Sequence, residues 1–210
     1  MSSRQQRAFN TLRRLTPERT PRERCDVCSV FLPEDHAHLV EPASRRLICA
    51  CAACLVSAGN QVGTPYRRVP RHVHFLPDFH LTDSQWDSLA IPVGMAFFFY
   101  STPASRVIAF YPSPAGATES LLNLEAWTEV VRDNPTLDTM QPDVEALLVN
   151  HLADTYEYYL APIDRCYELV GLMRAGWRGL NGGAEVWEQI GQFYARLREQ
   201  SSVPREQTHA

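Results

Sequence analysis

Five of the six cysteines in this chain lie within thirty residues, and this cluster constrains the fold more than any other feature. Cys25 and Cys28 form one CxxC pair, and Cys51 and Cys54 form a second. A CxxC turn places two thiolates on one side of an ion, so two such pairs complete the four-sulfur tetrahedron that zinc prefers. The chain shows no apolar leader of the kind found on secreted, disulfide-rich proteins. We therefore predict a structural zinc site in a protein of the reducing cytoplasm.

Three alternatives to this four-cysteine zinc site stay open. Cys49 is a fifth thiol and an alternative ligand to Cys51, and His36 or His38 is an alternative to one of the thiolates. Iron, held as in rubredoxin-like electron carriers, is the alternative metal, although the glycine or proline and the aromatic residue usual beside those cysteines are missing. Metal-free thiols that act as a redox switch are the third alternative, which the spare Cys49 favours.

The cysteine cluster is expected to fold as a small module over residues 25–60. Two short strands are predicted at 38–40 and 46–48, and the alanine-rich segment 49–55 is suited to begin a helix. A knuckle, a hairpin and a cysteine pair that opens a helix is the layout of a treble clef or zinc ribbon. The remaining parts of the chain are predicted as a basic flexible arm over 1–24, a linker over 61–75, a main domain over 76–199 and a flexible tail over 200–210.

The main domain is predicted to be α+β, because hairpin patterns alternate with helical ones. Thr82 and Gln85 fit a capping box that starts a short helix. Strands are predicted from apolar, aromatic and β-branched runs, at 94–100, 106–111, 144–151 and 155–160. Helices are predicted from the capping box and apolar periodicity, at 82–90, 124–132, 163–175 and 184–199. This order favours an antiparallel sheet with helices on one face.

The charge of the chain is unevenly distributed. All 20 basic residues are arginine, and residues 1–24 hold seven of them against Glu18 and Glu23. The rest of the chain is acidic, which disfavours a nucleic-acid-binding domain because such a domain carries a basic face. No apolar run reaches the roughly 18 residues of a transmembrane helix.

Residues 112–120 are the strongest candidate site outside the cysteines. This segment is predicted to be a loop that leaves a buried strand and enters a helix, where backbone N–H groups bind an anion or a peptide carboxylate. It lacks the glycines and lysine of a phosphate-binding P-loop. Trp and Arg are favoured anchors at protein interfaces, so the neighbouring Trp177 and Arg178 are also candidates for binding a partner. The candidate partner-binding residues are Ser113, Gly116, Thr118, Glu119, Trp177 and Arg178.

Other reactive side chains are interpreted as structural. Cys166 lies in an apolar helical pattern and is expected to be a small core residue. His72, His74 and His80 form a loose set that is expected to lie at the surface. The sequence shows no serine–histidine–aspartate order, no clear pair of carboxylates and no dinucleotide fingerprint, so no enzyme is predicted.

Six stretches of the sequence match a known family, at 25–28, 45–51, 76–79, 91–99, 110–120 and 163–172. They resemble an uncharacterised bacterial family, a domain of unknown function that is associated with gene clusters for actinobacterial-type, high-affinity NiFe hydrogenases. The resemblance runs from about residue 25 to residue 199 and implies an accessory role through gene association. It carries over no catalytic residue.

These observations favour a non-enzymatic accessory protein that assists assembly or maturation of a NiFe hydrogenase. In this hypothesis the zinc module and the 112–120 segment hold a protein partner, such as a hydrogenase subunit or a maturation factor. One alternative is a rubredoxin-like iron protein that passes electrons to or from a hydrogenase. A further alternative is a zinc-ribbon regulator that binds nucleic acid through the arginine-rich arm.

Overall fold

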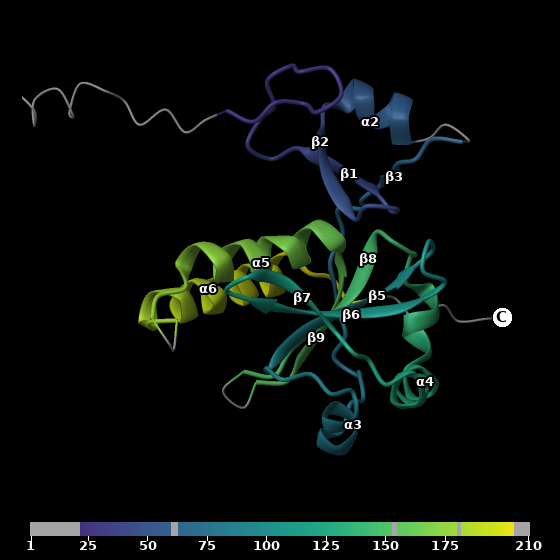
Figure 1. Cartoon of the computed structure of the whole chain (residues 1–210), viewed down its shortest axis with the longest axis vertical. Coiled ribbons are helices and arrows are strands. Elements are labelled where there is room, and N and C mark those ends of the chain that lie inside the picture. The colour runs from purple at the N-terminus through teal and green to yellow at the C-terminus, as the bar shows by residue number, and fades with distance from the viewer. Residues whose placement is uncertain (1–21, 60–62, 153–154, 180–181, 204–210) are drawn as a thin grey trace, which may run out of the picture.

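The computed structural model describes residues 22–59, 63–152, 155–179 and 182–203. A small module with a three-stranded sheet lies beside a larger domain built on a six-stranded sheet (Figure 1). Both sheets are antiparallel, as the sequence predicts, and the class is α+β. Nearly all of the predicted basic arm lies outside the described residues. Within the described ranges, no helix combines the length and the apolar character of a membrane span.

The module consists of a hairpin, a helix and a short third strand. Strands β1 (Ala37–Glu41) and β2 (Arg46–Ala50) pair in register, and helix α2 (Ala52–Gly59) follows. Leu39 and Ile48 face each other across the hairpin and are buried against Leu55 of α2. Alternate residues of a strand point to opposite faces, so His38 and Cys49 lie on the other side of the hairpin.

The predicted linker over 61–75 contains two short strands. Strand β3 (Arg67–Arg68) pairs with β1 and completes the module's sheet, in the order β2-β1-β3. Strand β4 (His74–Phe75) pairs with β9 at the edge of the larger sheet. Backbone pairing therefore anchors residues 67–68 to the module and residues 74–75 to the larger sheet, a long-range effect that the local composition does not reveal.

The larger sheet has the order β4-β9-β8-β5-β6-β7. The two hairpins predicted from sequence are its central strands, and they pair with each other through β5 and β8. Its longer strands are β5 (Met95–Ser101), β6 (Arg106–Ser113), β7 (Gly116–Ser120), β8 (Glu145–Asn150) and β9 (Glu157–Pro162).

Helices cover both faces of the larger sheet, whereas the sequence analysis predicted one. Figure 1 shows α5 and α6 on the side nearer to the module and α3 and α4 on the other side. The central strand β5 explains this arrangement, because Phe97 and Phe99 face α5 and α6 while Phe98 stacks on Trp127 of α4, with 5.0 Å between the ring centroids. The helical segments are α3 (Asp83–Ser88), α4 (Leu124–Asp133), the 3-10 helix η1 (Pro135–Thr139), α5 (Ile163–Gly176) and α6 (Ala184–Gln200).

Local sequence signals place several of these helices as predicted. Thr82 accepts a hydrogen bond from the Gln85 backbone, and the Gln85 side chain accepts one from the Thr82 backbone, so the capping box at the start of α3 is present. Asn123 caps α4 through bonds from the next turn. The predicted tail over 200–210 begins in ordered backbone, because Phe75 donates a 2.9 Å hydrogen bond to the carbonyl of Ser202.

Residues 112–120 form a β-hairpin and not the predicted loop into a helix. Strand β7 pairs with β6 from Ser113↔Gly116 to Ala109↔Ser120, around a tight turn. Gly116 adopts a φ of 121°, a conformation that strains residues with a side chain. Helix α4 begins at Leu124, after a further short connection, so the segment does not lead directly into that helix.

Charged contacts fix the module on the larger domain. Glu119 of β7 accepts a 2.9 Å bond from Arg45 in the β1–β2 turn and a 2.8 Å bond from Arg106 of β6. Arg67 of β3 lies 3.1 Å from the buried carboxylate of Asp143. His38 of β1 and Asp164 of α5 are 2.9 Å apart, and Val40 of β1 joins the larger domain's core.

Replacing Phe98 by alanine should lower the free energy of unfolding by about 3–5 kcal/mol, because a fully buried ring is lost and its partner ring is left over a cavity. Tyr100→Ala on the same strand should cost about 1 kcal/mol or less, since Tyr100 is 38% exposed. Urea denaturation of both variants measures the difference. Equal losses would contradict the two-sided core.

Glu119 should contribute a stability term that disappears at acid pH. Burial raises the pKa of Glu119, but Arg45 and Arg106 outweigh burial and hold the pKa below its ordinary value of 4.5. A carboxyl with a lowered folded-state pKa stabilises fully above its unfolded pKa, and this contribution is lost as the pH falls through the lowered pKa. Glu119→Gln should therefore be less stable than wild type by up to about 1 kcal/mol at neutral pH, and the gap should close below pH 4.5.

Urea titrations at a series of pH values test this dependence. Glu129→Gln, which removes an exposed carboxyl on α4, is the matched control and should show no such closing gap. A Glu119→Gln deficit that is constant with pH would contradict the ion-pair assignment.

Candidate metal centre

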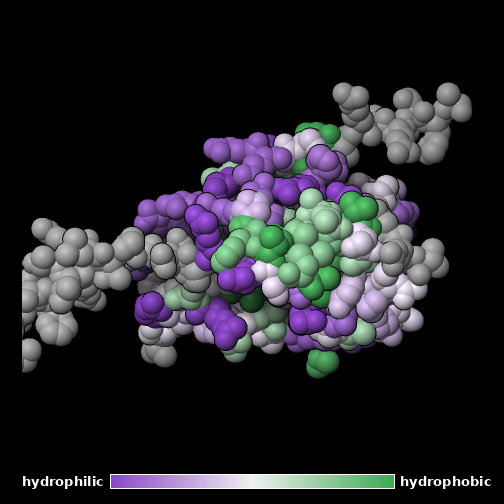
Figure 2. Space-filling view, turned by 90° about the horizontal axis from the view of Figure 1, so that it is seen from above, coloured by the Kyte–Doolittle hydropathy of each residue, from purple (hydrophilic) through white to green (hydrophobic). Residues whose placement is uncertain are grey.

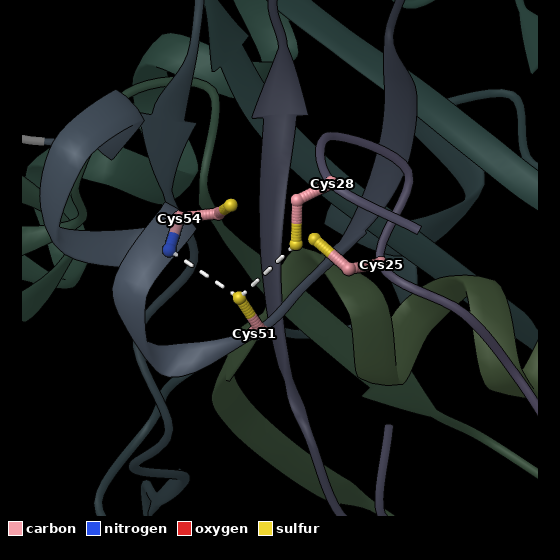
Figure 3. A group of neighbouring side chains, drawn as sticks. All are labelled: Cys25, Cys28, Cys51 and Cys54. Atoms are coloured by element: carbon pink, nitrogen blue, oxygen red, sulfur yellow. Dashed lines mark hydrogen bonds between the residues drawn. The ribbon is translucent and has the colours of Figure 1, made fainter. Parts of the chain in front are cut away.

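The four predicted ligands converge at one end of the module. Cys25 and Cys28 lie on a turn before β1, Cys51 directly precedes α2, and Cys54 lies in the first turn of that helix. This knuckle, hairpin and helix order is the one predicted from the sequence. The four side chains point toward one another, and their sulfur atoms all lie within 4.8 Å of each other (Figure 3).

The spacing and chemistry of this group suit a tetrahedral metal ion. The sulfurs of Cys28 and Cys51 are 3.7 Å apart. Zinc–sulfur bonds of about 2.3 Å place two sulfurs of a tetrahedron about 3.8 Å apart. Thiolates are ligands for zinc and for iron and not for magnesium or calcium. The donor set therefore fits a thiolate-binding metal ion such as zinc or iron.

Backbone hydrogen bonds shape each cysteine pair. Ser29 donates a 2.7 Å bond to the Cys25 carbonyl, and Cys25 donates a 2.9 Å bond to the Val30 carbonyl, which closes the knuckle. In the second pair, the Cys54 backbone N–H donates to the sulfur of Cys51 over 3.5 Å. These turns bring both thiols of a pair to the same side, which is the geometric basis of the CxxC signal.

The four thiols are coupled electrostatically, because sulfurs this close cannot all carry a negative charge without a cation. Burial raises the pKa of the Cys25 thiol, but backbone N–H groups of Cys51, Cys28 and Val27 outweigh burial and lower that pKa to about 6. Hydrogen bonding with the sulfurs of Cys28 and Cys51, together with burial, raises the pKa of Cys54 to about 12. A divalent cation at the centre would favour ionisation of all four.

The fifth thiol of the cluster is not one of the four converging sulfurs. Cys49 groups with His36 and His38, and one potential ligand atom from each of the three residues lies within 4.8 Å of the others. The sequence analysis treated all three as substitutes for a thiolate of the main site, and Cys49 also as a spare thiol for a redox switch. The register of the β1–β2 hairpin places His38 opposite Cys49. This pairing brings the three residues together, and their positions in the sequence do not reveal it.

The candidate partner-binding residues on the β6–β7 hairpin contact their own chain. The Ser113 hydroxyl lies 3.0 Å from the Gly116 carbonyl, to which it can donate, and 2.9 Å from the Thr118 hydroxyl. Glu119 is held by two arginines, as described above. These side chains stabilise the hairpin and its junction with the module.

Trp177 and Arg178 have a similar internal role after α5. The Trp177 ring N–H donates a 2.9 Å bond to the carbonyl of Gly179, and its ring meets the edge of Trp187. Arg178 donates from its guanidinium to the carbonyls of Ala175 and Trp177 at the helix end. Both side chains help to turn the chain between α5 and α6.

The remaining reactive side chains do not join a site. Cys166 is completely buried in the core against α6, and burial raises its pKa well above the ordinary value, so it is a poor nucleophile. His72 and His80 are exposed, while His74 lies 3.2 Å from the Ser202 hydroxyl. The three histidines form no metal-binding group among the described residues.

A model of a protein family, described as a family of unknown function (DUF5947), matches residues 24–201. The chain belongs to this family. The match confirms the resemblance to a family of unknown function, and it spans the four-cysteine module and the larger domain together. No curated protein and no solved structure matches the chain.

Cys54→Ser should lower the metal affinity of the four-cysteine site by more than about 100-fold, because losing a ligand costs more than losing an outer contact. Competition with a chromophoric chelator measures this affinity. In Cys54→Ser, the backbone amide hydrogens of β1 and β2 should also exchange faster than in wild type, whereas those of β5 and β8 should stay protected. Cys166→Ala, which removes a thiol outside the module, should keep the affinity of the wild type. Unchanged affinity in Cys54→Ser would contradict the ligand assignment.

Proposed function

We propose that this protein is a non-enzymatic accessory factor for the assembly or maturation of a NiFe hydrogenase, and that it uses a structural zinc module to hold a protein partner. The observation that carries the proposal is the convergence of four cysteine sulfurs at the end of a module that also exposes apolar side chains. The choice of a hydrogenase as the partner system rests on the sequence resemblance described above.

The four-sulfur donor set supports a structural role for the metal. Four protein ligands fill a tetrahedral shell and leave no position for water or substrate, which is the pattern of structural zinc sites. Cys25 and Cys54 are buried with Leu32 beneath the knuckle, so the ion would also serve as part of the module's small core. Zinc bound in this way stabilises the fold and performs no reaction.

The surface of the module supports a binding role. Figure 2 views the molecule from the end that carries the module in Figure 1 and shows hydrophobic residues gathered on this face. Exposed apolar groups that cluster on a protein surface often mark a contact with another protein. Large apolar side chains of the module that are about half exposed or more are Val27, Val30, Phe31 and Val56.

Deleting the gene should lower the amount of mature hydrogenase without changing the kcat or KM of the molecules that mature. The wild-type gene should restore maturation, and a Val56→Asp variant should restore less, because a charge on the apolar face opposes burial against a partner. Leu121→Asp is the matched control, since Leu121 is 96% exposed and lies outside the module. Activity per cell and activity per mature enzyme measure the two quantities. Normal maturation in the deletion strain would contradict the proposal.

An electron-transfer role is the second candidate, and the exposure of Cys28 favours it. A sulfur ligand at the surface would give electrons a short path to a partner, as in rubredoxin-like proteins, if the bound metal were iron. Metal analysis and a visible spectrum of protein purified without a metal-affinity tag separate the two candidates. One zinc in the four-cysteine site and no colour support the structural role, whereas reducible, coloured iron supports electron transfer.

A further inference from the structure

His36, His38 and Cys49 form a second group of metal-binding side chains beside the module's junction with the larger domain. His38 and Cys49 are directly opposite each other in the β1–β2 ladder, and His36 precedes His38 by two residues, so all three share one face. One potential ligand atom from each lies within 4.8 Å of the others. The opposite face of the hairpin is apolar, with Leu39 and Ile48 packed on α2.

Both histidines are oriented by oxygen acceptors at the same ring nitrogen. Nδ1 of His38 lies 2.9 Å from Oδ2 of Asp164, and Nδ1 of His36 lies 3.0 Å from the carbonyl oxygen of Pro33. A carbonyl oxygen and an ionised carboxylate accept hydrogen bonds and cannot donate them, so each Nδ1 carries the hydrogen. In neutral imidazole the lone pair then sits on Nε2. Metal-binding histidines show this same outer hydrogen bond to a carboxylate or a carbonyl.

The Nε2 atom of His36 is buried and has no hydrogen-bond partner. The side chain of His36 is only 5% exposed, and its Nε2 makes no hydrogen bond. The nearest carboxylate oxygen, Oε2 of Glu23, lies 3.4 Å away, which is within ion-pair range but without hydrogen-bond geometry. A buried polar atom without a partner is costly, and a lone pair that faces a carboxylate calls for a cation between the two.

We propose that His36, His38 and Cys49 bind a second divalent transition-metal ion, through Nε2 of each histidine and the sulfur of Cys49. Two imidazoles and one thiolate suit borderline ions such as Zn²⁺ and Co²⁺ and disfavour Mg²⁺ and Ca²⁺. Such an ion needs its ligand atoms about 3.4–3.8 Å apart, and one potential ligand atom of each residue already lies within 4.8 Å of the others. Three protein ligands leave a fourth position, and Glu23 lies at its rim.

This second site differs from the four-cysteine site in its chemistry and its position. The four-cysteine shell is complete, whereas the second site keeps a position for Glu23, water or an exchangeable ligand. The bond from His38 to Asp164 also connects the second site to the first turn of α5 in the larger domain. Ion binding there would fix the module against that helix. The inference does not depend on the proposed hydrogenase role.

Titration with Co²⁺ of protein that carries one zinc per chain, in the four-cysteine site, tests the second site. Cobalt bound to a thiolate gives a charge-transfer absorption, and native mass spectrometry counts zinc and cobalt in the same sample. We expect one cobalt per chain beside one zinc that stays in the four-cysteine site. Cys49→Ser should lose the charge-transfer band, and His38→Gln should weaken cobalt binding by more than about 100-fold, while both variants keep their zinc. His72→Gln, which removes an exposed histidine, should match wild type.

A gentler variant keeps the test decisive if a ligand substitution disturbs the module and releases its zinc. Asp164→Asn leaves all three ligands in place and removes only the carboxylate behind His38, so cobalt affinity should fall about 10–100-fold with the charge-transfer band retained. The proposal is overturned if wild type binds no cobalt beside its zinc, or if the band persists in Cys49→Ser. Unchanged cobalt affinity in His38→Gln that keeps its zinc would overturn it as well. If His38→Gln loses its zinc, unchanged cobalt affinity in Asp164→Asn would overturn the proposal instead.

Discussion

The convergence of Cys25, Cys28, Cys51 and Cys54 is the constraint on which the N-terminal module depends. The buried apolar residues between its hairpin and α2 are few, with Leu39, Ile48, Ala50 and Leu55 as their core. A core of this size rarely offsets the entropy of ordering the chain, which is why modules of this kind rely on a metal or on disulfides. Because β1 carries charged contacts to the larger domain, whatever orders the hairpin also orders that junction.

Local sequence signals predicted most of the elements. The capping box of α3, the two central hairpins and the long helices α5 and α6 follow from patterns within a few residues of each other. The continuous apolar run of β5 also held the information that both faces of the sheet are covered, since Phe97 and Phe98 point to opposite sides. The prediction of helices on one face was based on the order of the elements alone. The apolar residues on both sides of β5 did not contribute to it.

What the sequence could not predict depends on pairing between distant residues. Residues 67–68 form strand β3 because they pair with β1, and residues 116–120 form strand β7 because they pair with β6. The grouping of His36 and His38 with Cys49 likewise requires the register of the hairpin. Glu119 was expected to bind a partner, but its carboxylate is held by arginines from the module and from β6. An exposed charge in a sequence does not reveal whether its counterion belongs to the same chain.

The two ends of the larger sheet bear on how another protein could meet this molecule. One edge is the two-residue strand β4, whose outer backbone is engaged by Ser202, and the other is β7, whose Glu119 is clamped by Arg45 beside the module. Short, covered or charged edges discourage the addition of a further strand from another chain. Recognition through backbone pairing is thus disfavoured at both edges of the larger sheet, so a partner that meets this domain is expected to contact its side chains.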